Sequence, residues 1–336
     1  MRAVVLTRFG PPEALVAAEV PDPVPGPGQV LVDVEIANIT FVETQIRAGR
    51  APNPAMAPSL PAILGKGVGG FVTSLGPGGD PALAGVRVIG STGGSGGYAE
   101  LAAVNADALI AVPDGVGLAE AVALLADGRT ALALLGAAEV RAGETVLVEA
   151  AAGGVGSLLV QLAGGAGACV VAAAGGPGKL RIARELGAAV TVDYGQPDWA
   201  DRVRAGAGGV DVAFDGVGGA IGRAAFELVR RGGRFLCFGL ASGTFTAVSA
   251  TEAAERGVTL VRGVPIAPAE MVKLARAALD ELAAGRLRPV IGQTFPLEQA
   301  ASAHAAIEAR ETVGKTLLLV GATEGGQRLL RRGCVA

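Results

Sequence analysis

The chain has 336 residues, of which 51% are hydrophobic and 18% charged, so it is long enough for two domains and too apolar for global disorder. Its formal net charge of −3 and its lack of a long basic run argue against a nucleic-acid partner. Its three cysteines are widely separated and form no Cys-x-x-Cys pair, which argues against a disulfide scaffold or a cysteine-rich zinc site.

The N-terminus and the distribution of apolar residues bear on localisation. Residues 1–6 are followed by polar residues, without the charged and then apolar regions of a signal peptide. A membrane-spanning helix needs an apolar run of about 18 residues, and no run in this sequence reaches that length without a glycine or a charged residue. We therefore expect a cytoplasmic protein with no membrane partner.

Residues 1–125 contain short β-like runs separated by proline and glycine. The runs cover residues 3–6, 29–36, 69–75 and 86–90, and Pro21, Pro23, Pro25 and Pro27 break the chain between the first two. Strands this short and this frequent predict a compact antiparallel barrel or sandwich with few helices.

The pattern changes near Leu118, where a helix is expected over residues 118–135. Apolar strands and helices then alternate, with strands over 145–150, 169–174, 189–192, 210–214 and 233–238 and helices over 156–166, 179–186, 199–205 and 220–229. Continuous apolar strands that alternate with helices indicate a parallel sheet covered on both faces. We predict an α/β fold whose second domain is a doubly wound, Rossmann-type sheet.

The last part of the chain is too small for a third core. A helix over 268–284, a strand over 290–295, a helix over 297–309 and a strand over 316–320 are expected. We assign this part to the first domain and expect a flexible tail after it. The predicted division is 1–125 for the first domain, 126–262 for the doubly wound domain, 263–320 for the return to the first domain and 321–336 for the tail.

The most informative stretch is a turn of small residues between a strand and a helix. It reads Ala150-Ala151-Ala152-Gly153-Gly154-Val155-Gly156 and opens the strand–helix series. Small residues let the backbone approach a pyrophosphate, and a helix N-terminus offers free N–H groups and the positive end of its dipole. This context predicts nucleotide binding by Ala152, Gly153, Gly154, Val155 and Gly156.

The end of the next strand decides between the two nicotinamide cofactors. An NAD enzyme places Asp or Glu there for the ribose 2′-OH, whereas this chain reads Ala172-Ala173-Ala174-Gly175-Gly176 with Lys179 following. A carboxylate would repel a 2′-phosphate, and a lysine attracts it. The sequence therefore favours NADPH, with a solvated lysine at a helix start as the alternative interpretation of Lys179.

These motifs together resemble the zinc-independent quinone oxidoreductase (zeta-crystallin-like) branch of the medium-chain dehydrogenase/reductase superfamily. The resemblance extends to Val320 and includes residues 41–49, 96–100, 130–131, 238–239 and 303–315. It implies a GroES-like β-barrel for the first domain and a homodimer formed through the sheet edge at 236–239 and 259–264.

The resemblance also implies roles for individual residues. Gly153 to Gly156 would hold the pyrophosphate, and Gly175, Lys179 and Tyr194 match positions around the 2′-phosphate. Thr130 and the turn with Phe238, Gly239 and Ser242 match segments that line the nicotinamide. Residues 40–47 match the segment that lines the substrate cleft.

Zinc-dependent relatives have a cysteine near residue 40 and Gly-His-Glu near residue 66. This chain has Ile39-Thr40-Phe41 and Gly65-Lys66-Gly67 there, and its only histidine, His304, lies in a late helix. Because catalytic zinc needs three protein ligands, we expect no metal, and we interpret His304 as a packing or surface residue.

The substrate segment departs from its relatives. Thr40 stands where quinone reductases usually have Asn, and Gln45 where they often have an aromatic residue. Glu149 replaces a common His, and Gly67 replaces a common Glu. Neither tyrosine, Tyr98 or Tyr194, matches the tyrosine proton donor of enoyl-thioester reductases.

We therefore expect an enzyme that transfers a hydride from NADPH to a small quinone or conjugated carbonyl substrate. With no metal to polarise the carbonyl, Thr40, Gln45 and Arg47 are the candidate hydrogen-bond donors. Arg47 could equally be a structural partner of Glu43. The alternatives are an enoyl (thioester) reductase of a biosynthetic pathway and a non-catalytic NADPH-binding protein.

Overall fold

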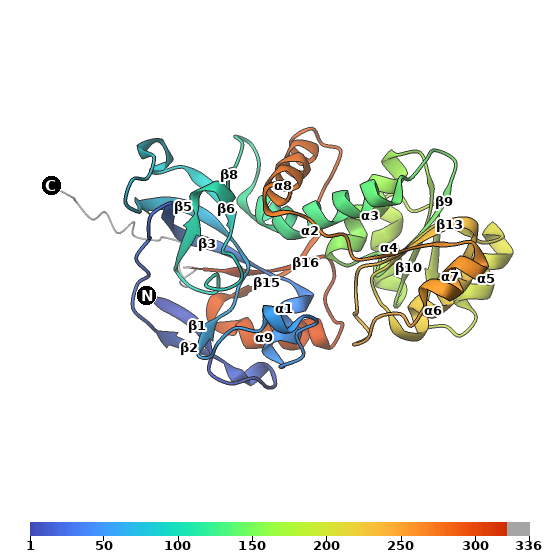
Figure 1. Ribbon diagram of the computed structural model, residues 1–336, viewed down its shortest axis with the longest axis horizontal. Coiled ribbons are helices and arrows are strands. Elements are labelled where there is room, and N and C mark those ends of the chain that lie inside the picture. The colour runs from blue at the N-terminus through green and yellow to red at the C-terminus, as the bar shows by residue number, and fades with distance from the viewer. Residues whose placement is uncertain (321–336) are drawn as a thin grey trace. The chain divides into compact units, whose positions relative to one another are not determined.

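The computed structural model describes residues 1–320, drawn as ribbons in Figure 1. The chain forms two compact units. Among the described residues, unit 1 consists of Met1–Val122, Gln293–Thr312 and 316–320, and unit 2 of Ala123–Gly292 and Val313–Lys315. The flexible tail predicted for residues 321–336 lies outside the described residues.

Unit 1 is built on antiparallel strands. Its larger sheet has the order β15-β16-β3-β5-β6-β8, with β7 also paired to β3, and its smaller sheet has the order β2-β1-β4. The strands are β1 (Arg2–Leu6), β2 (Leu15–Glu19), β3 (Gln29–Ile39), β4 (Ala62–Ile63), β5 (Gly67–Leu75), β6 (Arg87–Ser91), β7 (Leu101–Asn105), β8 (Leu109–Ala111), β15 (Ile291–Pro296) and β16 (Lys315–Leu319). Alternate residues of β3, among them Val30, Val32 and Val34, are fully buried, as expected for strands that cover one core. The antiparallel β domain predicted here is confirmed.

Two helices, α1 (Phe41–Arg47) and α9 (Ala300–Glu308), complete unit 1. The sequence analysis predicts the second but not the first. Helix α1 has only seven residues, too few for a clear apolar periodicity. Its N-terminus is closed by Glu43, whose carboxylate accepts a hydrogen bond from the Thr40 amide at 2.6 Å.

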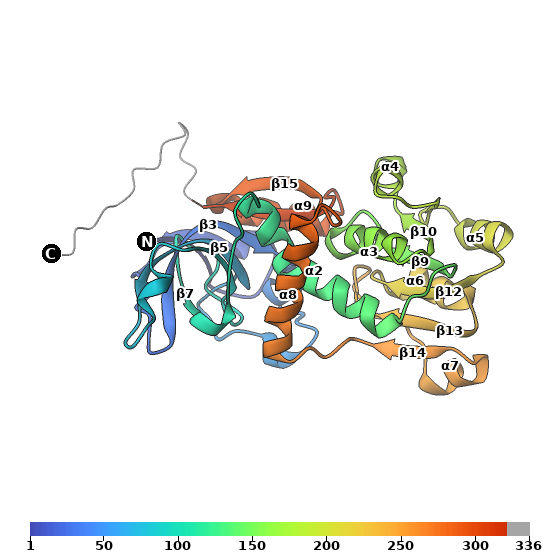
Figure 2. The same ribbon diagram turned by 90° about the horizontal axis from the view of Figure 1, so that it is seen from above.

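Unit 2 contains a parallel sheet with the order β11-β10-β9-β12-β13-β14. The strands are β9 (Thr145–Glu149), β10 (Cys169–Ala174), β11 (Val190–Asp193), β12 (Val210–Asp215), β13 (Val229–Cys237) and β14 (Thr259–Arg262). Numbered along the unit, this order is 3-2-1-4-5-6, the doubly wound arrangement of dinucleotide-binding domains. Figure 2 shows β10, β9, β12, β13 and β14 side by side in this order. The predicted Rossmann-type sheet is confirmed.

The helices of unit 2 are α2 (Leu118–Ala138), which begins in unit 1, α3 (Gly154–Gly165), α4 (Pro177–Glu185), α5 (Trp199–Ala207), α6 (Gly219–Leu228), α7 (Ala250–Arg256) and α8 (Pro268–Ala283). Helices α3 to α7 connect the strands of the sheet, α2 precedes the first of them and α8 follows the last. Helix α7 is absent from the sequence analysis. Helix α2 is long and apolar enough to cross a membrane by length and composition, but 61% of its apolar window is buried within the protein, as in a core helix.

The return to the first domain begins later than the sequence analysis places it. Residues 263–292 belong to unit 2, and unit 1 resumes at Gln293. Helix α8 packs on α2 at Gly128, where a Cβ would lie 2.7 Å from the Cβ of Ala278. The Gln161 side chain bonds both the N–H and the C=O of Arg288. These contacts involve residues far apart in sequence, so element patterns alone do not reveal them.

Candidate active site

The turn between β9 and α3 has the geometry of an anion-binding helix start. Gly153 precedes the first helical residue with extended backbone angles, φ −83° and ψ 176°. The following amides have no acceptor within the helix, as in the first turn of any helix. A Cβ on Gly156 would overlap the carbonyl oxygen of Ala150, so glycine is required there for α3 to lie against the strand end. The Gly153 amide donates to the Ala150 carbonyl at 2.7 Å within the turn, so the amides that the helix start presents together are those of Gly154, Val155 and Gly156.

An ion pair absent from the sequence analysis lies against this turn. Lys315 Nζ is 2.9 Å from Asp127 Oδ1, with side-chain exposures of 4% and 13%. Since 188 residues separate the two, no local pattern connects them.

The end of β10 lacks an acidic side chain, and three predicted residues surround it. Gly175 follows Ala174 directly, and a Cβ on Gly175 would lie 3.4 Å from the Tyr194 ring. The Tyr194 amide donates to the Ala174 carbonyl at 3.3 Å. Lys179 lies in the first turn of α4 and is half-buried. Asp193, the partner of Ala174 on β11, accepts a hydrogen bond from the Gly195 amide at 2.8 Å. The end of β10 itself has no carboxylate, and the nearby lysine and tyrosine suit a phosphate monoester.

The surface beside Tyr194 is hollowed. The hollow measures about 270 Å³ and is lined by Tyr194, Gly195, Gln196, Pro197, Trp199, Ala220 and Ile221. It extends the Gly175–Tyr194 corner along the same side of unit 2.

The turn after β13 lies against the turn after β12. The amides of Phe238 and Gly239 donate to the Asp215 carbonyl at 3.0 and 3.1 Å, and the Ser242 amide donates to the Val217 carbonyl at 2.8 Å. The Ser242 hydroxyl donates to the Thr244 carbonyl, and the Thr130 hydroxyl to the Ala126 carbonyl one turn back in α2. Both hydroxyls therefore contribute to local structure, whereas the backbone of residues 238–242 forms the wall that the sequence analysis assigns to the nicotinamide.

Two acidic side chains are fully buried beneath that wall, at the ends of β9 and β12. Asp215 accepts hydrogen bonds from the Gly218 amide at 2.7 Å and the Thr246 hydroxyl at 2.5 Å. Glu149 accepts one from the Val217 amide at 3.2 Å, and its Oε1 has no partner among the described residues. Burial, followed by the charge of Asp215 and a hydrogen bond to it, raises the pKa of Glu149 well above its ordinary value. The raised pKa favours the neutral form of Glu149 in the folded protein.

Thr40 and Glu43 form the polar start of α1. The Thr40 hydroxyl donates to Glu43 Oε2 at 2.9 Å, and Glu43 Oε1 accepts from the Lys66 amide at 2.9 Å. Because its proton is directed at a carboxylate, the Thr40 hydroxyl offers lone pairs rather than a proton to a ligand. The role of hydrogen-bond donor predicted for Thr40 requires this bond to break.

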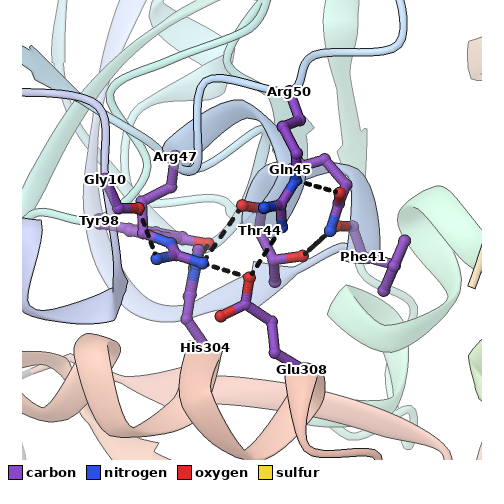
Figure 3. Close-up of polar contacts among 9 residues, drawn as sticks. All are labelled: Gly10, Phe41, Thr44, Gln45, Arg47, Arg50, Tyr98, His304 and Glu308. Atoms are coloured by element: carbon purple, nitrogen blue, oxygen red, sulfur yellow. Dashed lines mark hydrogen bonds and ion pairs between the residues drawn. The ribbon is translucent and has the colours of Figure 1, made fainter. Parts of the chain in front are cut away.

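Gln45 and Arg47 are directed into unit 1, as Figure 3 shows. The Gln45 amide donates to the Thr44 hydroxyl at 3.1 Å, and the Gln45 side chain is buried. Arg47 is 1% exposed, donates to the Gly10 carbonyl at 2.8 Å and forms an ion pair with Glu308 of α9. Arg47 is thus a structural residue in this arrangement, and its partner is Glu308 rather than Glu43. The carboxylate of Glu43 is occupied by the start of α1.

Tyr98 and His304 lie beside this ion pair in the interior of unit 1 (Figure 3). The Tyr98 hydroxyl is 3.0 Å from His304 Nε2, and the rings meet edge to face. Burial, followed by the charge of Glu43 and a hydrogen bond to it, raises the pKa of Tyr98 well above its ordinary value. Because Tyr98 donates to Glu43, we assign the Nε2–H tautomer to His304, which leaves Nδ1 without a partner among the described residues.

The His304 ring is a neutral packing residue, as the sequence analysis expects. Burial, and then the charge of Arg47, lower the pKa of His304 to about 3. A histidine with this pKa stays uncharged at neutral pH. It therefore cannot deliver a proton there.

Comparisons with known proteins agree with this architecture. Residues 26–114 match the family model "Alcohol dehydrogenase GroES-like domain", and residues 186–318 match "Zinc-binding dehydrogenase". A quinone oxidoreductase from Pseudomonas aeruginosa is 33% identical over 95% of this chain and 99% of its own. A 2-haloacrylate reductase from Burkholderia is 31% identical over 94% and 98%. The structure of Escherichia coli quinone oxidoreductase complexed with NADPH superposes with a TM-score of 0.86 at 28% identity, over 95% of this chain and 100% of that one.

The chain belongs to the quinone oxidoreductase branch of the medium-chain dehydrogenases/reductases. The resemblance stated from the sequence is thereby confirmed. One of the two family models is named for zinc, but this family member has no sulfur, imidazole or carboxylate ligand at residues 39–41 or 65–67. Within residues 1–320, no group of three His, Cys, Asp or Glu side chains is arranged to hold a metal ion.

Proposed function

We propose that this oxidoreductase transfers a hydride from NADPH to a quinone or a conjugated carbonyl compound. The observation that carries the proposal is the carboxyl edge of the unit 2 sheet, where a diphosphate-binding turn stands next to a strand end with Lys179 and no acid. The relatives named quinone oxidoreductase support the choice of substrate.

The residues present fit NADPH by the chemistry of their donors. The amides of Gly154, Val155 and Gly156 suit the diphosphate, because a helix start binds anions through free N–H groups and its dipole. Lys179 and Tyr194 offer a cation and a phenol where the 2′-phosphate is expected. The backbone of residues 238–242 is held by amide hydrogen bonds to Asp215 of β12 and to the turn after it, and offers a wall for the nicotinamide.

When bound, NADPH supplies the hydride, and the protein supplies orientation and a dry surface. The two substrate classes differ in how the reduced product obtains its proton, and this difference favours a quinone over an enoyl thioester as substrate. The Thr40 proton is directed at Glu43, and Tyr98 is buried and bonded to His304. A hydroquinone anion can take its proton from water, whereas an enolate formed from a thioester depends more on a placed acid. The geometry around α1 therefore suits quinone reduction better.

An enoyl reductase is the second candidate, because the 2-haloacrylate reductase among the relatives bears a name that implies an activated C=C substrate. We expect the protein to oxidise NADPH with 1,4-benzoquinone and 9,10-phenanthrenequinone, and the loss of NADPH absorbance measures this oxidation. Turnover of crotonyl-CoA or 2-chloroacrylate alone would favour the reductase of C=C bonds. Tight NADPH binding without any turnover would favour a non-catalytic NADPH-binding protein.

Replacing Lys179 with alanine tests the cofactor assignment. A charge-assisted bond to a phosphate contributes about 1.5–3 kcal/mol, so the dissociation constant for NADPH should rise about tenfold or more while that for NADH stays within about twofold. Arg181→Ala is the matched control, because Arg181 lies on the same helix, is 73% exposed and pairs with Glu185. Equal losses for both cofactors would contradict the role of Lys179.

The outer edge of the unit 2 sheet bears on the assembly of the protein. Strand β14 ends the unit 2 sheet and pairs only with β13 among the described residues, so its outer edge offers the hydrogen-bonding groups of a strand to a second copy. We propose a cytoplasmic homodimer joined through this edge.

A further inference from the structure

Asp127 places a carboxylate beside the start of α3, where an acidic side chain would oppose an anionic ligand. A Cβ on Gly154, the first residue of α3, would overlap Asp127 Oδ2. The Asp127 side chain is only 13% exposed, so water screens its charge weakly. A free carboxylate at this point would compete with a diphosphate for the positive end of the helix dipole.

Lys315 neutralises that carboxylate from a segment fastened to the same turn. Its Nζ is 2.9 Å from Asp127 Oδ1 and is almost wholly buried. The preceding residue, Gly314, donates its amide to the Ala152 carbonyl and forms a parallel bridge with Gly153. Residues 313–315 therefore belong to unit 2 through the diphosphate turn itself.

A second cation acts on the same carboxylate. Arg129 lies two residues further along α2, where burial lowers the pKa of Arg129 and the charge of Asp127 raises it. Both cations thus lie in electrostatic range of Asp127. Lys315 is the one that contacts the carboxylate directly, so its loss leaves Asp127 without its ion-pair partner.

We propose that Lys315 is a positioning residue for NADPH, which acts by binding and neutralising Asp127 so that the start of α3 can accept the diphosphate. The inference rests on the proposed function, because it concerns the same cofactor. It predicts that Lys315 matters only while Asp127 is present. Asp127 would thus repel the diphosphate, and Lys315 of residues 313–315 neutralises that charge.

The test is a double-mutant cycle in the full-length protein, read by calorimetric titration with NADPH and with adenosine 2′-phosphate, which lacks the diphosphate. Lys315→Met should weaken NADPH binding about tenfold or more, as expected for one uncompensated charge at short range in a partly desolvated site. Asp127→Asn should bind NADPH as tightly as the wild type or more tightly. The double variant should return to within about threefold of the wild type.

The control variant and the second ligand separate this role from a general loss of folding or of binding. Lys273→Met removes the same charge from an exposed ion pair on α8 and should leave both affinities unchanged. Adenosine 2′-phosphate should bind all variants alike, because it does not reach the start of α3.

The outcomes are distinguishable. A double variant as weak as Lys315→Met would overturn the inference, because Lys315 would then act on the ligand without Asp127. Asp127→Asn as weak as Lys315→Met would also overturn it, since the pair would then only shape the turn. If Lys315→Met does not fold, the other two variants still decide. A wild type that binds no NADPH would refute the proposed function instead.

Discussion

Replacing Glu308 with alanine is expected to destabilise unit 1 by about 3–5 kcal/mol, because it leaves the Arg47 charge buried without its partner. Arg47 is 1% exposed and Glu308 is 26% exposed, so the arginine depends on the pair more than the carboxylate does. Burial already lowers the pKa of Arg47, and Glu308 provides the largest opposing effect. Nearby His304 cannot replace Glu308, because burial and the charge of Arg47 lower the pKa of His304 to about 3 and the neutral ring carries no negative charge.

Replacing Arg47 itself separates the effect of the buried charge from the effect of side-chain packing. Arg47→Met keeps the apolar stem and exposes Glu308 to water, so we expect a smaller loss of about 1–3 kcal/mol from the unpaired Gly10 carbonyl. The double variant should be more stable than Glu308→Ala, because no buried charge remains. Urea unfolding followed by circular dichroism measures all three.

An exposed pair in the same unit provides the control. Glu298 is 42% exposed and pairs with Arg2, and Glu298→Ala should change the stability by only about 0–1 kcal/mol. Arg47→Met should also retain NADPH-dependent turnover per folded molecule. A variant with wild-type stability and a collapsed turnover number would instead show that Arg47 acts on the substrate.

The strand–helix series of unit 2 is predictable because its signals are local. Six residues from Cys169 to Ala174 form β10 as expected, since a short apolar run between glycines in a strand–helix series favours a buried strand. The diphosphate turn is equally local, because strand, small residues and helix start are contiguous. The cofactor preference follows from one strand end, at Ala174 and Gly175.

The two short helices that were not predicted, α1 and α7, are marked in the sequence by their capping residues and not by apolar periodicity. Helix α7 begins with Ser249, whose hydroxyl accepts from the Glu252 amide, and ends at Gly257 in the left-handed region. Thr40 and Glu43 have the same spacing at the start of α1. This Ser/Thr-x-x-Glu pattern marks a helix start even where seven residues are too few to show periodicity.

The polar network of unit 1 could not have been predicted, because its members meet only in the folded chain. Arg47 and Glu308 are 261 residues apart, and Tyr98 and His304 are 206 apart. Sequence patterns within one element cannot connect such residues. The same limit explains why Arg47 looked free for catalysis: its position on α1 is local information, whereas its burial by α9 is not.

Replacing Glu149 with glutamine is expected to stabilise unit 2, and the gain should grow with pH. The pKa of Glu149 is raised in the folded state, so the stability linked to its neutral form is complete below the unfolded pKa of 4.5 and is lost as the pH rises through the folded pKa. Glutamine stays neutral and can still donate to Asp215. We expect little gain near pH 4.5 and about 1–3 kcal/mol at pH 8.5, the usual penalty for a poorly compensated buried group.

Trp199 makes the measurement selective, since it is the only tryptophan and is 5% exposed in the core of unit 2. Urea unfolding followed by its fluorescence at the two pH values gives the difference directly. Asp215→Asn is the contrasting variant: Asp215 accepts three hydrogen bonds, from Val217, Gly218 and Thr246, so its loss should destabilise the unit at both pH values. A Glu149→Gln protein that is less stable than the wild type at pH 8.5 would mean that Glu149 is charged and compensated. The folded protein would then not favour the neutral form of Glu149, contrary to the raised pKa.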